Sequence, residues 1–352
     1  MISVYLKPTN RCNILCDHCY VPDEFKVSNI LLSDEVVSRL VDFINRMNED
    51  TVHIIWHGGE PLFYGVDLLR KYSEIIKEGI KSRVSFFIQT NLVLELRELN
   101  LLLDYVREYT NSNVGTSYDF YIRKYRGSHE NFKEKWLENV HFMVQNGVFV
   151  SVNITLTKLV NVELLFNFID EMLKIGVKGF HLERFTSSGR GKFFSDDLYL
   201  SNEEFFNLMI DILDRYIKEL QSGKFFYLNP FDKMTKSYFF GRGGGCFSGD
   251  CMARMITINP DGTVSNCPDL AFYDEYIFGN LLTDSFEQIF YNKKRLKAIK
   301  AQEMFICSDC KFFPYCHGGC PHHFAGFDGK SCRKFFSVFT DKVNLLYNYL
   351  IQ

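Results

Sequence analysis

The sequence predicts an α/β fold built on a parallel sheet, followed by a small cysteine-rich domain. The first half contains six short runs of apolar and β-branched residues. Segments with apolar residues at helical spacing lie between these runs, as in Val37, Leu40, Val41 and Ile44. In the tail this alternation stops, and eight of the eleven cysteines lie between Cys246 and Cys332.

The six runs are the expected strands, and their near-continuous apolar character is typical of parallel strands covered by helices. They are residues 2–7, 52–56, 84–89, 114–117, 148–155 and 179–185. Six strand and helix units form either an open doubly wound sheet or an incomplete barrel.

A closing helix is expected over residues 201–220, where Ser201 and Glu204 have the spacing of a capping box. Leu200 and Phe205 would form the accompanying hydrophobic staple. We therefore predict a first domain over residues 1–225, a cysteine-rich domain over 240–335 and a C-terminal helix over 336–352. One helix from about residue 285 to 300 should interrupt the cysteine-rich domain, which has few apolar runs and needs metal to hold it.

Composition and charge exclude several classes of function. The chain has 352 residues, 46% of them hydrophobic, and a net charge of −3 with no basic cluster that would indicate nucleic-acid binding. No run approaches the length needed to span a bilayer, and the N-terminus lacks a signal peptide, so we expect a cytoplasmic protein. In that reducing compartment, eleven cysteines indicate metal binding rather than disulfides.

Three cysteines, Cys12, Cys16 and Cys19, follow the first expected strand with the spacing C-x3-C-x2-C. Thiolates are ligands for zinc or iron-sulfur clusters. A structural zinc site needs four ligands, and His18, next to Cys19, is poorly placed to be the fourth. Three thiolates on a four-iron cluster leave one iron open for a small molecule.

This motif at the end of strand one resembles the radical S-adenosylmethionine (SAM) superfamily. The resemblance implies a partial (β/α)6 TIM-type barrel and a 4Fe-4S cluster whose open iron is chelated by SAM. Reductive cleavage of SAM then gives a 5'-deoxyadenosyl radical that abstracts hydrogen from the substrate. In that family an aromatic residue near the adenine precedes the last cysteine, and here His18 occupies that position.

Further polar segments lie at successive strand ends, where active sites of parallel α/β folds are found. "HGGEP" follows the second strand, and in the superfamily its GGE segment receives the amino group of SAM. "QTN" and "SYD" end the third and fourth strands and resemble positions that contact the ribose and carboxylate of SAM. The resulting SAM-binding candidates are His18, His57, Gly58, Gly59, Glu60, Gln89, Ser117 and Arg126.

The cysteines of the tail resemble the SPASM extension of radical SAM enzymes, which holds two auxiliary 4Fe-4S clusters. A hairpin turn at residues 260–262 would bring Cys251 and Cys267 to one site. By the resemblance, the first auxiliary cluster is held by Cys246, Cys251, Cys267 and Cys320. The second is held by Cys307, Cys310, Cys316 and Cys332. The three sets use all eleven cysteines, although paired cysteines of this kind also build zinc ribbons.

SPASM enzymes mostly modify peptides or proteins, and the preferred hypothesis is a maturase that crosslinks a ribosomally made precursor peptide. The alternative is an anaerobic sulfatase-maturing enzyme, which makes formylglycine. Members of that group carry an aspartate base directly after the cysteine equivalent to Cys267, whereas here Pro268 intervenes before Asp269. Glu183, Arg184 and Asp269 are the candidates for substrate contacts or proton removal.

The expected partners are the precursor peptide and a flavodoxin- or ferredoxin-type reductant. Because strand one begins almost at once, we expect no leader-recognition module ahead of it, and a separate protein could present the precursor. The rival from another class is a non-catalytic iron-sulfur or zinc protein, without SAM cleavage.

Overall fold

Eight of the strands form one series of parallel neighbours. The computed structural model describes residues 1–241, 245–247, 251–301, 307, 309–320 and 329–350. Parallel pairing runs from β10 through β1 and β3 to β4, and a bridge between Gln89 and Gly115 continues it into β5, β7, β8 and β9. The bounds are β1 Ile2–Leu6, β3 Thr51–Trp56, β4 Arg83–Ile88, β5 Asn113–Ser117, β7 Phe149–Leu156, β8 Gly179–Arg184, β9 Tyr227–Asn229 and β10 Met255–Ile258.

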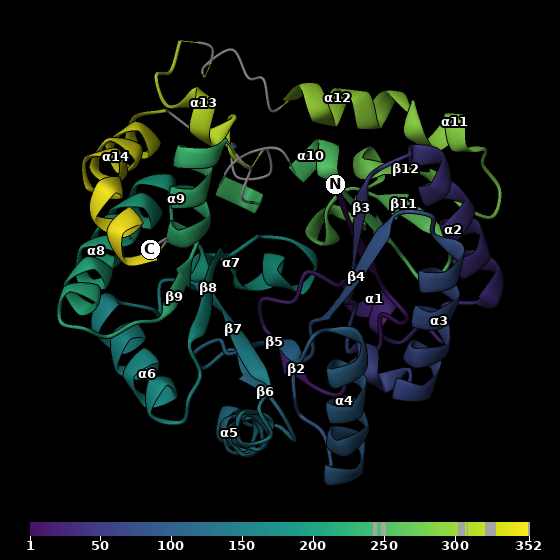
Figure 1. The fold of residues 1–352 in the computed structure, drawn as a ribbon, viewed down its shortest axis with the longest axis horizontal. Coiled ribbons are helices and arrows are strands. Elements are labelled where there is room, and N and C mark those ends of the chain that lie inside the picture. The colour runs from purple at the N-terminus through teal and green to yellow at the C-terminus, as the bar shows by residue number, and fades with distance from the viewer. Residues whose placement is uncertain (242–244, 248–250, 302–306, 308, 321–328, 351–352) are drawn as a thin grey trace.

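Helices cover the outer side of this series (Figure 1). Those helices are α2 Asp34–Met47, α3 Val66–Gly79, α4 Leu96–Tyr109, α5 His129–Gln145, α6 Val162–Lys174 and α8 Asn202–Gln221. Each of the six predicted strands is confirmed within two residues at either end. The sheet curves into an incomplete barrel, which decides between the two architectures that the pattern allowed.

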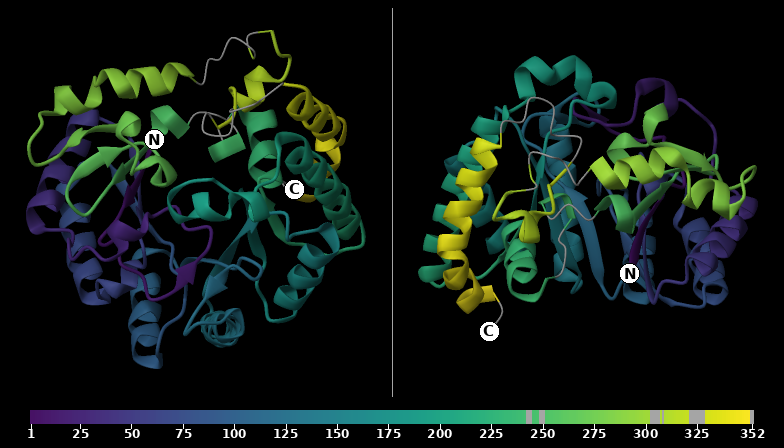
Figure 2. Two further views of the ribbon diagram at one scale, coloured as in Figure 1. Left: turned by 180° about the vertical axis from the view of Figure 1, so that it is seen from behind. Right: turned by 90° about the horizontal axis from the view of Figure 1, so that it is seen from above.

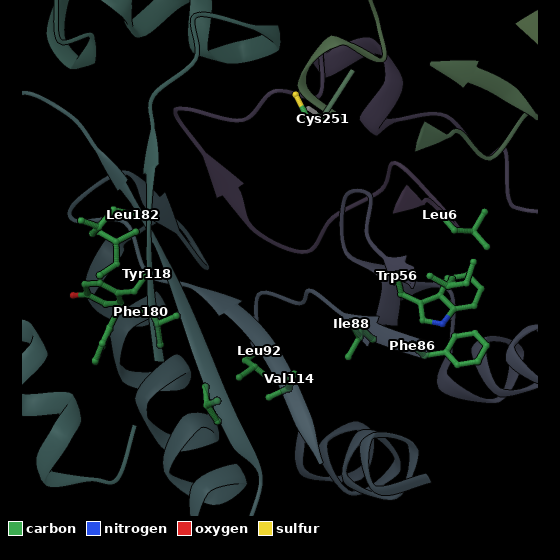
Figure 3. Packing of buried hydrophobic residues seen from close by; sticks show 14 of the residues in the cluster. Leu6, Trp56, Phe86, Ile88, Leu92, Val114, Tyr118, Phe180, Leu182 and Cys251 are labelled. Atoms are coloured by element: carbon green, nitrogen blue, oxygen red, sulfur yellow. The ribbon is translucent and has the colours of Figure 1, made fainter. Parts of the chain in front are cut away.

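Alternation along the strands separates an outer face from an inner face. Leu6, Trp56 and Ile88 are buried under the helices, where Figure 3 shows them beside Phe86. The Trp56 Nε1 donates a hydrogen bond of 2.7 Å to the Tyr105 hydroxyl of α4. Polar residues that alternate with these apolar ones, such as those next to Leu6 and Leu182, therefore lie on the inner face.

The cysteine-rich segment extends the same sheet. Its strand β10 pairs in parallel with β1, and β11 Thr263–Ser265 and β12 Ile277–Asn280 follow antiparallel. The predicted hairpin turn is confirmed: the Asn259 N–H donates to the Thr263 carbonyl, and Gly262 has a φ of 84°. The cysteine-rich segment is therefore hydrogen-bonded to β1 through β10.

The closing helix and its cap are as predicted. In α8 the Ser201 hydroxyl accepts from the Glu204 N–H, and the Glu204 carboxylate accepts from the Ser201 N–H. Leu200 and Phe205, the expected staple, are both buried.

The single helix expected over residues 285–300 is wrong, because two helices occupy that range. They are α11 Phe286–Phe290 and α12 Lys293–Ala301. Asn292 lies between them, where its Oδ1 accepts from the Lys294 N–H and its Nδ2 donates to the Phe278 carbonyl. Such side-chain bonds to the backbone compete with helix continuation, and they begin a new helix here.

Three further helices stand on the other side of the barrel mouth from α11 and α12. They are α9 Phe231–Phe240, α13 Phe313–Cys316 and α14 Lys330–Leu350. The views in Figure 2 show α14 lying along α8 and α9, and α11 and α12 lying across the mouth from them. The predicted C-terminal helix thus begins six residues earlier than expected and contains Cys332. Among the described helices, none combines the length and apolar content needed to cross a membrane.

Candidate active site at the carboxyl ends of the strands

The loop that carries Cys12, Cys16 and Cys19 leaves the carboxyl end of β1 and is held by backbone pairing on two sides. On one side β2 Leu15–Cys16 pairs antiparallel with β6 Arg123–Lys124. On the other side the Gly59 N–H donates to the Thr9 carbonyl at 3.0 Å, and the Glu60 N–H donates to the Arg11 carbonyl at 2.8 Å. Segments that follow β3 and β5 therefore position the cysteine loop.

The glycines of the HGGE segment are needed for this pairing. A Cβ on Gly59 would lie 2.2 Å from the Arg11 carbonyl oxygen, and one on Gly58 would lie 2.3 Å from that of Thr9. Gly58 also has a φ of 129°, which L-residues rarely adopt. The absence of a side chain at these glycines lets the backbone of the cysteine loop approach, and their expected contact with SAM stays a prediction.

Glu60 is buried and fully engaged with the protein. Its carboxylate accepts from the N–H groups of Leu62 and Asn91 at 3.0 and 2.7 Å and from the Thr90 hydroxyl at 2.8 Å. Burial raises its pKa to about 7, although these donors act in the opposite direction. Glu60 thus ties the end of β3 to the end of β4. Its expected contact with an ammonium group stays a prediction.

His57 lies beside the cysteine loop as a neutral side chain. The Tyr20 hydroxyl lies 2.9 Å from His57 Nδ1 and donates to the Gly58 carbonyl at 2.9 Å. Burial, and then the charge of Lys7, lowers the pKa of His57 to about 3. A neutral imidazole here can accept or donate a hydrogen bond but carries no charge.

Asp119, after β5, is the charged centre of the site. Its carboxylate accepts from Arg123 Nε at 2.6 Å and from the Thr155 N–H at 2.6 Å, and it lies 3.1 Å from His18 Nε2. Burial would raise its pKa, but Arg123, His18 and the hydrogen bonds hold the pKa well below the usual range. The anionic Asp119 thereby links the cysteine loop, through His18, to the ends of β5 and β7.

The other candidates near these strands are placed differently from one another. Gln89 and Ser117 meet directly, with Gln89 Nε2 donating to Ser117 Oγ at 2.9 Å. Arg126 is not brought to this group, because its side chain is 71% exposed and lies 3.8 Å from Glu95. The arginine that the fold buries beside the cysteine loop is Arg123, three residues earlier.

The thiols of the cysteine loop lie in a desolvated environment. Burial, then the charge of Glu60, raises the pKa of Cys12 to about 12, and burial likewise raises the pKa of Cys16. Bound iron would reverse this effect, since coordination deprotonates a thiol. Asn91 Nδ2 already donates to Cys12 Sγ at 3.6 Å. Among the described residues, no three cysteine, histidine or acidic side chains are arranged around one metal-ion position.

The division of the tail cysteines into two cluster-binding sets stays a prediction, and electrostatic effects link the members of each expected set. Desolvation, then Asp269, raises the pKa of Cys267, and the thiols of Cys246, Cys320 and Cys251 raise it further.

The second set behaves in the same way. Desolvation raises the pKa of Cys332 to about 12, and the thiols of Cys316, Cys310 and Cys307 add to the effect. In each expected set, the other three thiols therefore raise the pKa of one member.

Two of the three catalytic candidates face the interior. The Asp269 carboxylate lies in the short helical turn Pro268–Leu270 and accepts from the Thr186 hydroxyl at 3.0 Å. Glu183, on the inner face of β8, accepts from Asn153 Nδ2 at 3.0 Å. Reduced hydration, then the charges of Asp269 and Asp119, raises the pKa of Glu183 to about 7.

Arg184 points the other way. Its guanidinium donates to Asn202 Oδ1 at 2.8 Å and to the Leu200 carbonyl at 3.2 Å. It also lies over the Phe205 ring, 4.7 Å from the centroid. In this structure Arg184 fastens β8 to the start of α8.

Sequence reasoning missed four residues that the fold brings to the site: Lys7, Asn91, Asp119 and Arg123. Asn91 and Asp119 belong to the QTN and SYD segments, so their position at strand ends was an available signal. No local sequence signal marked Arg123 or Lys7, because their contacts depend on pairing between distant segments.

Two family models match the chain. The model of the radical SAM superfamily matches residues 6–172, and the SPASM model, described as an iron-sulfur cluster-binding domain, matches residues 246–311. The chain is a radical SAM enzyme with a SPASM domain. SAM and a 4Fe-4S cluster are the cofactors of the first part, and the SPASM domain binds auxiliary iron-sulfur clusters.

Curated relatives are similar over nearly the whole chain. A serine-type anaerobic sulfatase-maturating enzyme of Bacteroides thetaiotaomicron is 25% identical over 350 residues, which cover 91% of this chain and 82% of the relative. A cysteine-type enzyme of Clostridium novyi is 23% identical, with 91% and 87% covered.

Solved structures share the fold. The structure of anSMEcpe with bound AdoMet has a TM-score of 0.81 at 19% identity and covers 99% of this chain and all of that one. SuiB of Streptococcus suis bound to its precursor peptide SuiA has a TM-score of 0.65 at 14% identity, with 93% and 73% covered.

Proposed function

We propose that this radical SAM/SPASM enzyme oxidises a serine or cysteine side chain of a protein substrate to formylglycine, as anaerobic sulfatase-maturating enzymes do. The observation that carries the proposal is similarity to such enzymes over more than nine-tenths of the chain. It favours this reaction over the peptide crosslinking that the sequence motifs first led us to prefer. Peptide-bound structures of anSMEcpe and SuiB support a polypeptide substrate.

Three cysteine sets would hold three 4Fe-4S clusters. Cys12, Cys16 and Cys19 would hold the SAM-binding one, and the two tail sets would hold the auxiliary pair. When bound, SAM and these clusters supply a radical that removes one hydrogen atom from the substrate β-carbon and a route for one electron. A flavodoxin- or ferredoxin-type protein is the proposed source of the reducing electron.

The remaining step is loss of one proton, and Asp269 is the proposed acceptor. Oxidation of a serine CH2OH group to an aldehyde releases one hydrogen atom, one electron and one proton, so a base completes the balance. From a cysteine the same three losses give a thioaldehyde, which water hydrolyses to the aldehyde with release of hydrogen sulfide. Asp269 follows Cys267 by two residues rather than one, yet it lies close enough to Cys267, Glu183 and Lys7 to shift the pKa of each. The extra Pro268 therefore leaves a carboxylate facing the interior.

The inner face of the barrel would position the substrate. Glu183, held by Asn153, and the neutral His57 present hydrogen-bonding groups on opposite sides of the interior. Asp119 and Arg123 balance each other's charge beside the cysteine loop. Water excluded from such a site cannot quench a reactive intermediate.

The test is anaerobic turnover with a peptide that spans the modification site of a sulfatase. After reconstitution we expect roughly twelve irons per chain, formation of 5'-deoxyadenosine and a product that reacts with a hydrazide. Cys16→Ala should retain roughly eight irons and make no 5'-deoxyadenosine. A peptide that loses two hydrogens but fails to react with the hydrazide would indicate a crosslink and overturn formylglycine formation.

A further inference from the structure

Lys7 is a buried ammonium group on the inner face of the barrel. It follows β1 directly, its exposed fraction is 0%, and its N–H donates to the Ile258 carbonyl at 3.0 Å. Alternation along β1 places it on the same face as Tyr5 and opposite Leu6. Among the described residues, no oxygen or other acceptor hydrogen-bonds its Nζ.

Two aromatic rings hold this ammonium in place without accepting conventional hydrogen bonds. Its Nζ lies 4.9 Å from the centroid of the Tyr20 ring and 4.6 Å from that of Phe272. Tyr20 is fixed by its hydroxyl contacts with His57 and Gly58, and Phe272 packs on Phe25 with centroids 4.7 Å apart. The rings give the charge partial compensation and a defined position.

The two rings come from the two parts of the enzyme. Tyr20 follows Cys19 of the first cysteine loop, and Phe272 follows the helical turn that carries Asp269. Burial lowers the pKa of Lys7 to about 7, while Asp269, Cys267 and Cys19 act to raise it. The ammonium thus lies between the cysteine loop and the segment after Cys267. The first would hold SAM and the second carries the proposed base Asp269, so the proposed substrate would contact both segments.

A buried cation without an acceptor is costly, so a bound group that supplies an oxygen would be strongly favoured. Asp269 does not fill this role, because its carboxylate accepts a hydrogen bond from the Thr186 hydroxyl and none from Lys7 Nζ. We propose that Lys7 binds a carbonyl or carboxylate oxygen of the substrate polypeptide near the residue that is modified. This inference rests on the proposed polypeptide substrate and makes Lys7 a specificity-determining residue.

The decisive variant is Lys7→Met in the reconstituted enzyme, because methionine keeps the stem and removes the donors. Lys7→Arg is the conservative variant that should restore part of the binding. Lys192→Met is the matched control, since the Lys192 ammonium also lies over a ring, that of Tyr273 at 4.9 Å, but the residue is exposed.

We expect Lys7→Met to retain its iron, to have a thermal midpoint no lower than that of the wild type because a buried charge without an acceptor is removed, and to still cleave SAM in the absence of peptide. Its Kd and KM for the sulfatase peptide should rise at least roughly tenfold, and Lys192→Met should match the wild type. Loss of peptide-independent SAM cleavage would assign the oxygen to the carboxylate of SAM and overturn the proposal. Equal peptide Kd for Lys7→Met and wild type would make Lys7 a structural residue.

The same measurements separate this inference from the proposed function. Peptide bound by the wild type and weakened by Lys7→Met, but never converted to aldehyde, would overturn formylglycine formation alone. No peptide binding by the wild type would overturn both.

Discussion

Replacing Gly59 by alanine should detach the first cysteine loop while leaving the barrel folded. The new Cβ would lie 2.2 Å from the Arg11 carbonyl oxygen and 2.4 Å from that of Asn10. Both atoms belong to the backbone, so no side-chain rotation relieves the contact. The outer face of β3, where Trp56 packs, would be untouched.

The structure sets the size of the effect. Contacts of a real Cβ are essentially never shorter than 3.0 Å, so the loop must move by the difference from 2.2 Å, about 0.8 Å. Such a shift would lengthen the bonds from Gly59 to Thr9 and from Glu60 to Arg11, now 3.0 and 2.8 Å, beyond hydrogen-bonding range. At about 1 kcal/mol each, the loop loses about 2 kcal/mol of anchoring.

The assay is iron content and SAM cleavage after anaerobic reconstitution. Gly59→Ala should lose about four of roughly twelve irons and make no 5'-deoxyadenosine. Gly79→Ala is the control, because its added Cβ meets only the Val41 side chain between α2 and α3. Full iron content and wild-type SAM cleavage in Gly59→Ala would refute the role assigned to this backbone pairing.

Three further predictions concern other parts of the chain. Asp119→Asn leaves the Arg123 guanidinium buried beside a neutral amide, so the thermal midpoint should fall by several degrees and SAM cleavage should drop; an unchanged midpoint would contradict this. Burial raises the pKa of Asp232 from 3.8 to about 7, so the folded state binds more protons than the unfolded state and stability falls as pH rises through that window. The free energy of unfolding falls by at most on the order of 4 kcal/mol. Asp232→Asn should therefore make the thermal midpoint depend less on pH between pH 5 and 8, and the same pH dependence in variant and wild type would exclude this role of Asp232. Cys332→Ser should lower iron by about four atoms yet keep SAM cleavage without peptide, measured as 5'-deoxyadenosine, and loss of that cleavage would count against separate cysteine sets.

Local pattern was sufficient for the strands and for the chemistry of the first motif. Short apolar, β-branched runs that alternate with helical patterns favour strands, which is why six strand positions were predictable. The spacing of Cys12, Cys16 and Cys19 was informative because one short loop must present all three thiols. The helix cap at Ser201 was equally local, since both of its partners lie within three residues.

Contacts between distant segments were beyond the reach of local pattern. Arg126 and Arg123 are equally plausible anion partners in the sequence, and only the pairing of β6 with the cysteine loop buries Arg123. The break at Asn292 was missed because its carbonyl partner, on Phe278, belongs to β12.

The sequence by itself determined the strand series, and its motifs were enough to indicate membership in a family that uses SAM. Tertiary structure alone decided that the HGGE glycines admit the cysteine loop, that β10 extends strand one, and that Lys7 is left without an acceptor between Tyr20 and Phe272. The reason is physical: periodicity and spacing act over a few residues, whereas a buried polar group finds its partners across the whole fold.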